Sequence, residues 1–207
     1  MEEIIRVKQL SKFYNGQAAV NNLNLSVRHG TVFGLIGANG AGKSTTIECI
    51  LGTKKADSGE IEVLGLNPQK QRKRLFENVG VQFQEANYQD KIMVTELCEV
   101  TQSLYKQPSN YQELLKQFGI ANKAKSLVNE LSGGQKQKLF IVLALIPNPK
   151  VVFLDELTTG LDTRARREVW KILSDLKEKG VTIFLTSHFM DEVEALCDYI
   201  CILKRDR

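Results

Sequence analysis

The chain has 207 residues and a formal net charge of +4, which is spread along the sequence rather than gathered in a tail. This length suits one domain, or a domain with a subdomain, and the mild basicity gives no reason to expect a nucleic-acid partner. The four cysteines form no CxxC pair and have no histidine at metal-ligand spacing, so they indicate neither a disulfide scaffold nor a zinc site. The longest apolar run, at 139–146, is far shorter than the ~20 residues that span a bilayer.

The N-terminal region predicts an antiparallel flap. The segment "EIIRVKQL" and the alternating segment "LNLSV" read as two strands on either side of a turn. An apolar strand, "TVFGLIG" at 31–37, then runs directly into a glycine-rich turn and the helix "KSTTIECILG". This order of strand, turn and helix is the context that a phosphate-binding loop requires.

The glycine-rich turn fits the phosphate-loop pattern G-x-x-x-x-G-K-[ST] without a mismatch. Its backbone N–H groups are expected to surround phosphates, Lys43 to reach the β- and γ-phosphate oxygens, and the Ser44 hydroxyl to bind Mg²⁺. A chance glycine turn is the alternative, and the correct flanking strand and helix argue against it. The nucleotide-binding residues predicted here are Gly37, Ala38, Asn39, Gly40, Ala41, Gly42, Lys43, Ser44 and Thr45.

Three further apolar segments, at 79–83, 151–156 and 181–188, read as buried strands of a parallel sheet. A helix is expected from about Asp162 to Gly180, and the stretch from about 88 to 146 reads as a helical insertion without a strand. Asp155, at the end of the second segment, can hold Mg²⁺, and Glu156 can take a proton from an attacking water. These two carboxylates could also be plain loop acids that cap the next helix.

With these motifs in place, the sequence resembles the ATP-binding cassette (ABC) transporter ATPases over essentially its whole length. The segments "GANGAGKST", "LSGGQ", "VVFLDE", "GLD" and "SH" occur in the order and at about the spacing of that family. The signature "LSGGQ" is absent from kinases, GTPases and other phosphate-loop proteins. The sequence around "LDELTTGLD" and "TSHFMDE" is most similar to the branch that drives export of drugs, antibiotics, lipids or polysaccharides.

The resemblance implies a role for each matching position. Tyr14 is implied to stack on adenine, Gln84 to contact Mg²⁺ and the attacking water, and His188 to contact the γ-phosphate. Tyr14 could also be an ordinary flap aromatic. Asp162 is implied to cross to a partner subunit, although it would serve equally well as a helix cap. The signature residues are implied to bind the nucleotide of the partner chain, and they are Ser132, Gly133, Gly134 and Gln135.

The implied fold is an α/β phosphate-loop (RecA-like) ATPase with a mostly parallel sheet, an antiparallel flap and an inserted helical subdomain. We expect one ABC domain over 1–207, with a core of about 1–87 and 148–207 and a helical subdomain of about 88–147. The implied activity is MgATP hydrolysis by a homodimer or a paired heterodimer that drives a separate transmembrane permease. Such a subunit is cytoplasmic and peripheral on the inner face of the cell membrane.

Two other functions remain open at this point. One is a soluble ABC-type ATPase that regulates ribosomes or DNA, although such proteins usually carry two cassettes or a long coiled-coil insertion. The other is a nucleotide-binding subunit without turnover, which the presence of Glu156 and His188 disfavours. The chain also departs from the family, which usually has proline where Leu157 stands and often where Thr163 stands. Family members normally continue with another strand and helices after "YICIL", so the resemblance implies a truncated or a short form.

Overall fold

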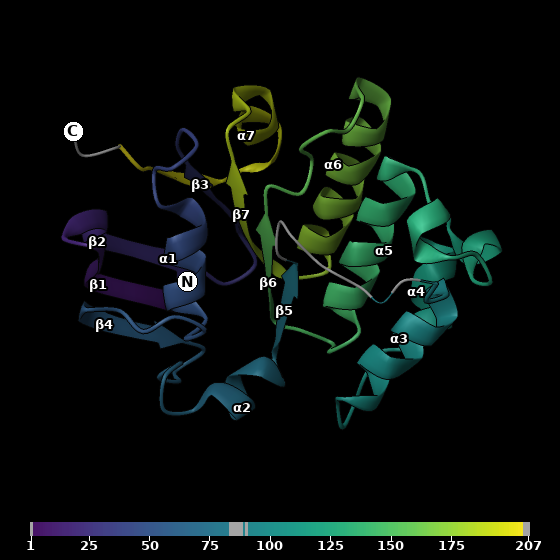
Figure 1. Cartoon of the computed structure of the whole chain (residues 1–207), viewed down its shortest axis with the longest axis horizontal. Helices are drawn as coiled ribbons and strands as arrows, with labels where there is room; N and C mark the ends of the chain where they lie inside the picture. The colour runs from purple at the N-terminus through teal and green to yellow at the C-terminus, as the bar shows by residue number, and fades with distance from the viewer. Residues whose placement is uncertain (1, 83–88, 90, 205–207) are drawn as a thin grey trace.

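The structure, a computed structural model, describes residues 2–82, 89 and 91–204. It consists of two β-sheets with helices between and around them (Figure 1). The chain therefore forms the α/β architecture with one parallel and one antiparallel sheet that the sequence predicts.

The parallel sheet has five strands in the order β5-β6-β7-β3-β8, and every neighbouring pair is parallel. The strands are β3 (Val32–Ile36), β5 (Val79–Gln82), β6 (Val151–Asp155), β7 (Thr182–Ser187) and β8 (Tyr199–Ile202). All residues of β3, β6 and β7 are buried, because helices cover both faces of the sheet. Parallel strands end at the same edge, so the residues that follow β3, β6 and β7 come together there.

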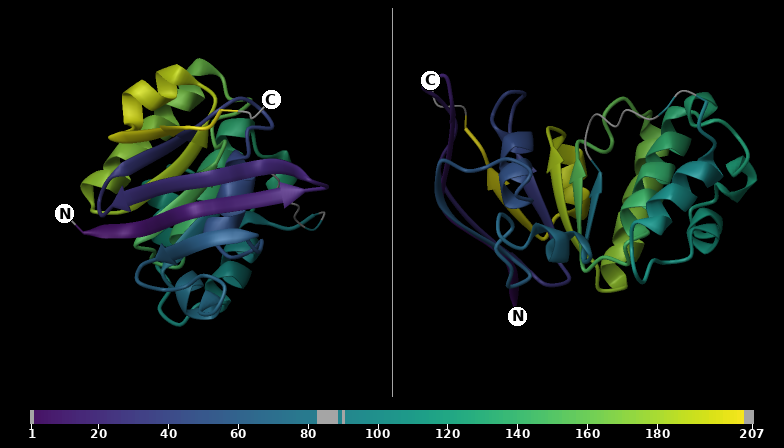
Figure 2. Two further views of the ribbon diagram at one scale, coloured as in Figure 1. Left: turned by 90° about the vertical axis from the view of Figure 1, so that its left-hand side faces the viewer. Right: turned by 60° about the horizontal axis from the view of Figure 1, so that its bottom comes forward.

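The antiparallel sheet has the order β2-β1-β4 and lies as a separate layer on one side of the molecule (Figure 2). Its strands are β1 (Glu3–Tyr14), β2 (Gln17–Arg28) and β4 (Ser58–Val63). Asn15 and Gly16 both have positive φ, which suits the two-residue turn of a right-twisted hairpin. The predicted flap is correct, whereas β4 was not predicted: it is an edge strand rich in exposed residues.

Two apolar cores lie on the two faces of the parallel sheet. On one face, α1 (Lys43–Ile50) packs between the two sheets, with Phe33, Phe153 and Phe184 pointing towards it. On the other face, Val152, Leu154 and neighbouring side chains pack against three helices. These helices are α5 (Gly133–Leu145), α6 (Thr163–Glu178) and α7 (Met190–Leu196).

The predicted helical insertion, from about 88 to 146, includes α5, which packs against the parallel sheet. The elements before α5 lie beyond it, at the far side from the antiparallel sheet (Figure 1). They are α3 (Val94–Ser103), α4 (Tyr111–Gln117) and the 3₁₀ turns η1 (Ala121–Lys123) and η2 (Val128–Glu130), and the remaining helix is α2 (Arg72–Phe76) before β5. Among the described residues between 91 and 146 there is no strand. None of the helices in the described ranges is long and apolar enough to cross a membrane.

Candidate nucleotide-binding site

The predicted phosphate loop connects β3 to α1. Gly42 has φ 91° and a Cβ at this position would collide with the carbonyl oxygen of Ala19, so only glycine fits. Within the described part of the chain, no side chain caps the start of α1. The first N–H groups of this helix are therefore available to an anion at the end of the helix dipole.

Lys43 is almost completely buried beneath this loop. Its Nζ donates hydrogen bonds to the carbonyl oxygens of Gly37, at 2.9 Å, and Ala38, at 3.3 Å. It also forms an ion pair of 3.0 Å with Oε1 of Glu156, and the two side chains are only 4% and 8% exposed. The lysine and the glutamate that the sequence assigns to catalysis thus contact each other directly.

The two predicted carboxylates follow one another at the end of β6 and are both held by Thr186 on β7. The Thr186 hydroxyl donates to Oδ1 of Asp155 at 2.5 Å and accepts the backbone N–H of Glu156 at 3.0 Å. Glu156 has φ 50°, a left-handed conformation that is uncommon for a residue other than glycine. Thr186 is a site residue that the sequence reasoning missed, and its signal was a threonine inside an apolar strand.

His188 comes directly after β7 and completes a cluster with the lysine and the glutamate. Its Nδ1 lies 3.7 Å from Oε1 of Glu156, and its side chain is 30% exposed. Lys43, Glu156 and His188 come from three separate segments and meet where β3, β6 and β7 end. The structure therefore brings together three residues, any two of which are more than thirty positions apart in the sequence.

A cavity of about 420 Å³ lies against this cluster. Tyr14, at the end of β1, lines it and is partly exposed, with the Nζ atoms of Lys12 and Lys54 at 5.5 and 5.6 Å from its ring. The cavity thus joins the predicted base-stacking residue to the predicted phosphate loop. Its lining residues are Tyr14, Ala19, Asn39, Gly40, Gly42, Lys43, Ser44, Thr45 and Glu156.

The signature segment lies elsewhere, in a second cavity of about 370 Å³. Ser132 caps α5, and its Oγ accepts the N–H of Gln135 while the Gln135 side chain accepts the N–H of Ser132. Asp162 caps α6 beside it, where its Oδ1 accepts the N–H of Ala165 at 2.8 Å. Ser132, Gly133, Gly134, Gln135 and Asp162 therefore share one surface that is distinct from the phosphate-loop cavity.

The remaining predicted positions have different outcomes. Gln84 lies outside the described residues, so its place relative to the site stays a prediction. Leu157 is buried in the core on the α5 side of the sheet, which anchors the loop after Glu156 by apolar packing where the family usually has proline. Thr163 begins α6 directly after its Asp162 cap.

The four cysteines, Cys49, Cys98, Cys197 and Cys201, form no disulfide.

The donors near the phosphate loop suit magnesium. Mg²⁺ prefers oxygen ligands and usually keeps several waters beside one or two carboxylates and the substrate phosphates. Asp155 offers a buried carboxylate at the end of β6, and Ser44 offers a hydroxyl on the cavity wall. No group of three or more His, Cys, Asp or Glu side chains within the described ranges is placed to enclose a metal ion by itself.

Fold and motifs together define a phosphate-loop protein with one cavity at the phosphate loop and a second cavity at the signature segment. Its family is the ABC transporter family, to which the chain belongs, because the model of that family matches residues 20–159. The chain is 39% identical over 208 residues to the Nod factor export ATP-binding protein I of Rhizobium etli, covering 98% of this chain and 66% of that protein. It is 34% identical over 206 residues to the bacitracin transport ATP-binding protein BcrA of Bacillus licheniformis, covering 98% and 67%.

The fold also matches a solved structure of the same family. The dimeric structure of a bacterial ABC transporter cassette superposes with a TM-score of 0.84 at 25% identity, covering 97% of this chain and 94% of that chain. The chain spans about two thirds of the length of the two curated relatives.

Proposed function

We propose that this chain is the ATP-hydrolysing subunit of an ABC transporter. The observation that carries the proposal is the contact of Lys43, Glu156 and His188 beside the phosphate-loop cavity, over distances of 3.0 and 3.7 Å. An ammonium group, a carboxylate and an imidazole at the mouth of a phosphate loop are the groups that in-line attack of water on a γ-phosphate needs.

In the proposed reaction, the backbone N–H groups at the start of α1 and the Lys43 ammonium bind the triphosphate. Glu156 accepts a proton from the attacking water, and His188 stabilises charge on the transferred phosphoryl group. Because Glu156 contacts Lys43 in the free protein, the phosphates take over the ammonium and release the carboxylate for this task. Ser44, Asp155 and Gln84 would hold Mg²⁺, which neutralises phosphate charge when it is bound.

The separate signature cavity supports a dimeric mechanism. Ser132, Gly133 and Gly134 present a hydroxyl and a helix N-terminus that suit an anion, yet they line a different cavity from the phosphate loop of their own chain. Two chains that meet head to tail would place this cradle on the γ-phosphate bound by the other chain. The similarity to a dimeric ABC cassette supports this arrangement.

The curated relatives favour transport over regulation of ribosomes or DNA. The Nod factor relative is an export protein and BcrA is a bacitracin transport protein. By analogy, this subunit acts on the cytoplasmic side of the membrane and drives export through a separate permease. The region from 88 to 146, together with the loop that begins at Gln84, is proposed to carry the surface that docks on the permease.

The transport role is tested by reading the adjacent reading frame, which should encode a membrane protein of about six spans, and by co-expressing that protein with this chain. A permease subunit should co-purify with the chain and raise its rate of ATP hydrolysis, and a Lys43→Ala variant should co-purify but hydrolyse no ATP. Crosslinks from the permease should fall on residues 88–146 or on the loop that begins at Gln84. Crosslinks that avoid both segments, or a rate that does not depend on the permease, would contradict the transport role.

A further inference from the structure

His188 is in contact with α6 through one aromatic side chain. The His188 imidazole and the Phe189 ring have centroids 4.1 Å apart and planes inclined by 38°. Cζ of Arg166, on α6, lies 4.2 Å from the centroid of the same Phe189 ring. A guanidinium over an aromatic face is attracted by the ring's quadrupole, so Arg166 restrains the ring on which the histidine packs.

Arg166 is fixed in place for this contact. Its Nη1 forms an ion pair of 3.3 Å with Asp191 in the first turn of α7. Its Nε atom is buried and has no hydrogen-bond partner within the described part of the chain. A buried N–H without a partner adds no restraint, so the ion pair with Asp191 and the contact with the Phe189 ring are what hold the guanidinium. The Phe189 backbone is fixed as well, since its N–H donates to Ser187 Oγ at 3.0 Å.

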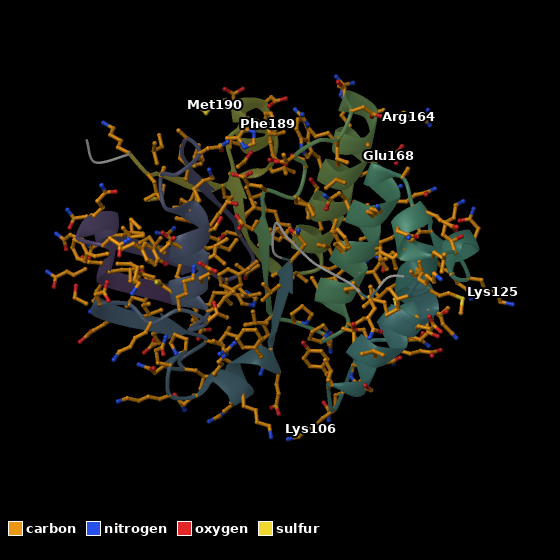
Figure 3. The ribbon with its side chains drawn as sticks, viewed as in Figure 1. Lys106, Lys125, Arg164, Glu168, Phe189 and Met190 are labelled. Atoms are coloured by element: carbon orange, nitrogen blue, oxygen red, sulfur yellow. The ribbon has the colours of Figure 1, made fainter. Side chains whose placement is uncertain are left out.

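The same turn of α6 contacts the signature segment on its other side. Arg166 follows Ala165, and a Cβ placed on Gly134 would lie only 3.2 Å from the Ala165 Cβ, which shows how closely α5 and α6 approach there. Arg164 and Glu168 also lie on the α5 side, away from Phe189 at the start of α7 (Figure 3). The first turn of α6 is thus packed between the signature segment and Phe189, the ring on which His188 packs.

Further contacts join α7 to α6 below this turn. Trp170 Nε1 donates to Oε1 of the buried Glu192 at 3.2 Å. Lys177 forms an ion pair of 2.5 Å with Asp198 just after α7. These contacts join both ends of α7 to α6, so we expect a shift of α6 to displace the start of α7 with it.

We propose that Arg166 and Phe189 are positioning residues for His188, and that they make the orientation of this histidine depend on the first turn of α6. The inference rests on the proposed function. A nucleotide bound to the partner chain that contacts the signature segment and Asp162 would fix the position of the first turn of α6. The Arg166–Phe189 stack would then hold His188 towards the γ-phosphate bound by its own chain. Engagement of one ATP site would in this way prepare the histidine of the other.

A kinetic double-mutant cycle tests the positioning role. Phe189→Leu should lower kcat roughly tenfold, because the imidazole loses its orientation, while the KM for ATP changes little. Phe189→Tyr, which keeps the ring, should restore most of the rate. In a His188→Ala background, Phe189→Leu should cause no further loss, because its effect acts only through that histidine. Losses that multiply in the double variant would overturn the proposal.

The chain supplies a matched control in a second arginine–phenylalanine stack away from the site. Cζ of Arg72 lies 5.5 Å from the ring centroid of Phe76 on α2. Phe76→Leu also removes a ring beneath a guanidinium, but it should leave kcat unchanged. If Phe76→Leu lowers kcat as much as Phe189→Leu does, the effect is general destabilisation and the positioning role is wrong.

A second measurement does not depend on activity. The chain has only two histidines, His29 and His188, so the imidazole NMR signals are readily assigned. Arg166→Met should shift the His188 signals in the native chain and should shift them much less in a Phe189→Leu background, while Arg72→Met should not move them. Equal shifts in both backgrounds would refute transmission through the ring. If this dependence holds in a protein without ATPase activity, the proposed function fails and the positioning role stands.

Discussion

Replacing Lys43 with methionine tests the buried ion pair at the centre of the site. The Nζ of Lys43 and Oε1 of Glu156 are 3.0 Å apart, and both side chains are almost inaccessible to solvent. At an effective dielectric constant of about 20, two unit charges at this distance attract each other by about 5.5 kcal/mol. Methionine keeps the length of the side chain but leaves the Glu156 carboxylate buried without the ammonium.

We expect Lys43→Met to lower the free energy of unfolding by about 3 kcal/mol, because removing one member of a buried pair leaves the other charge uncompensated. The double variant Lys43→Met/Glu156→Gln should recover most of this loss, since no buried charge then lacks its partner. The assay is urea unfolding at constant pH, followed by circular dichroism, with ΔG from linear extrapolation.

Lys54→Met is the control, because Lys54 pairs with Glu48 at 2.8 Å while its side chain is 44% exposed. An exposed pair contributes about 1 kcal/mol or less, so this variant should change stability only slightly. Equal losses of stability in Lys43→Met and Lys54→Met, or a double variant less stable than Lys43→Met alone, would show that the Lys43–Glu156 pair does not stabilise the fold.

The hydrogen bonds of Thr186, the ring of Tyr14 and the burial of the Cys98 thiol each give a further prediction. Thr186→Val removes the hydroxyl that hydrogen-bonds to Asp155 and to the Glu156 N–H, so it should lower the free energy of unfolding by roughly 1–3 kcal/mol and reduce kcat. Unchanged stability in urea unfolding together with an unchanged kcat in an ATPase assay would contradict this. Tyr14→Ala should weaken ATP and GTP binding alike by roughly 1–3 kcal/mol in calorimetry, as base stacking tolerates any base, and unchanged affinities would remove Tyr14 from the site. Burial raises the pKa of the Cys98 thiol to about 12, so Cys98 should resist iodoacetamide at pH 8 until the chain is unfolded, and rapid labelling of the native protein would show that this thiol is accessible.

Local patterns were sufficient to predict the phosphate loop and α6. The loop is set by a continuous run of residues, and α6 by an Asp162 cap and apolar positions on one face, of which Val169, Leu173 and Leu176 are buried. The strand β4 was missed because its sequence, "SGEIEV", is polar and largely exposed. Its pairing with β1, over forty residues earlier, determines that it is a strand, and no local pattern records that contact.

Lys43 and Glu156 were predicted from local motifs and His188 from the resemblance, but their contact with one another was not predicted. The spacing of Lys43, Glu156 and His188 along the chain does not indicate that they meet. The parallel order of β6, β7 and β3 brings them together, because the three strands end at one edge of the sheet. Thr186 and the stack of Arg166 on Phe189 were missed for the same reason, since each is defined by a contact between separate elements.

If each ATP lies between the phosphate loop of one chain and the signature segment of another, Glu156→Gln should trap a dimer that size-exclusion chromatography detects. This variant should bind MgATP without cleaving it, and should elute as a dimer with MgATP and as a monomer without it. Adding Ser132→Arg, which places bulk in the signature cradle, should abolish the dimer while each monomer still binds nucleotide in calorimetry. A double variant that still dimerises on MgATP, or a Glu156→Gln protein that stays monomeric with bound MgATP, would show that ATP is not held between the two chains.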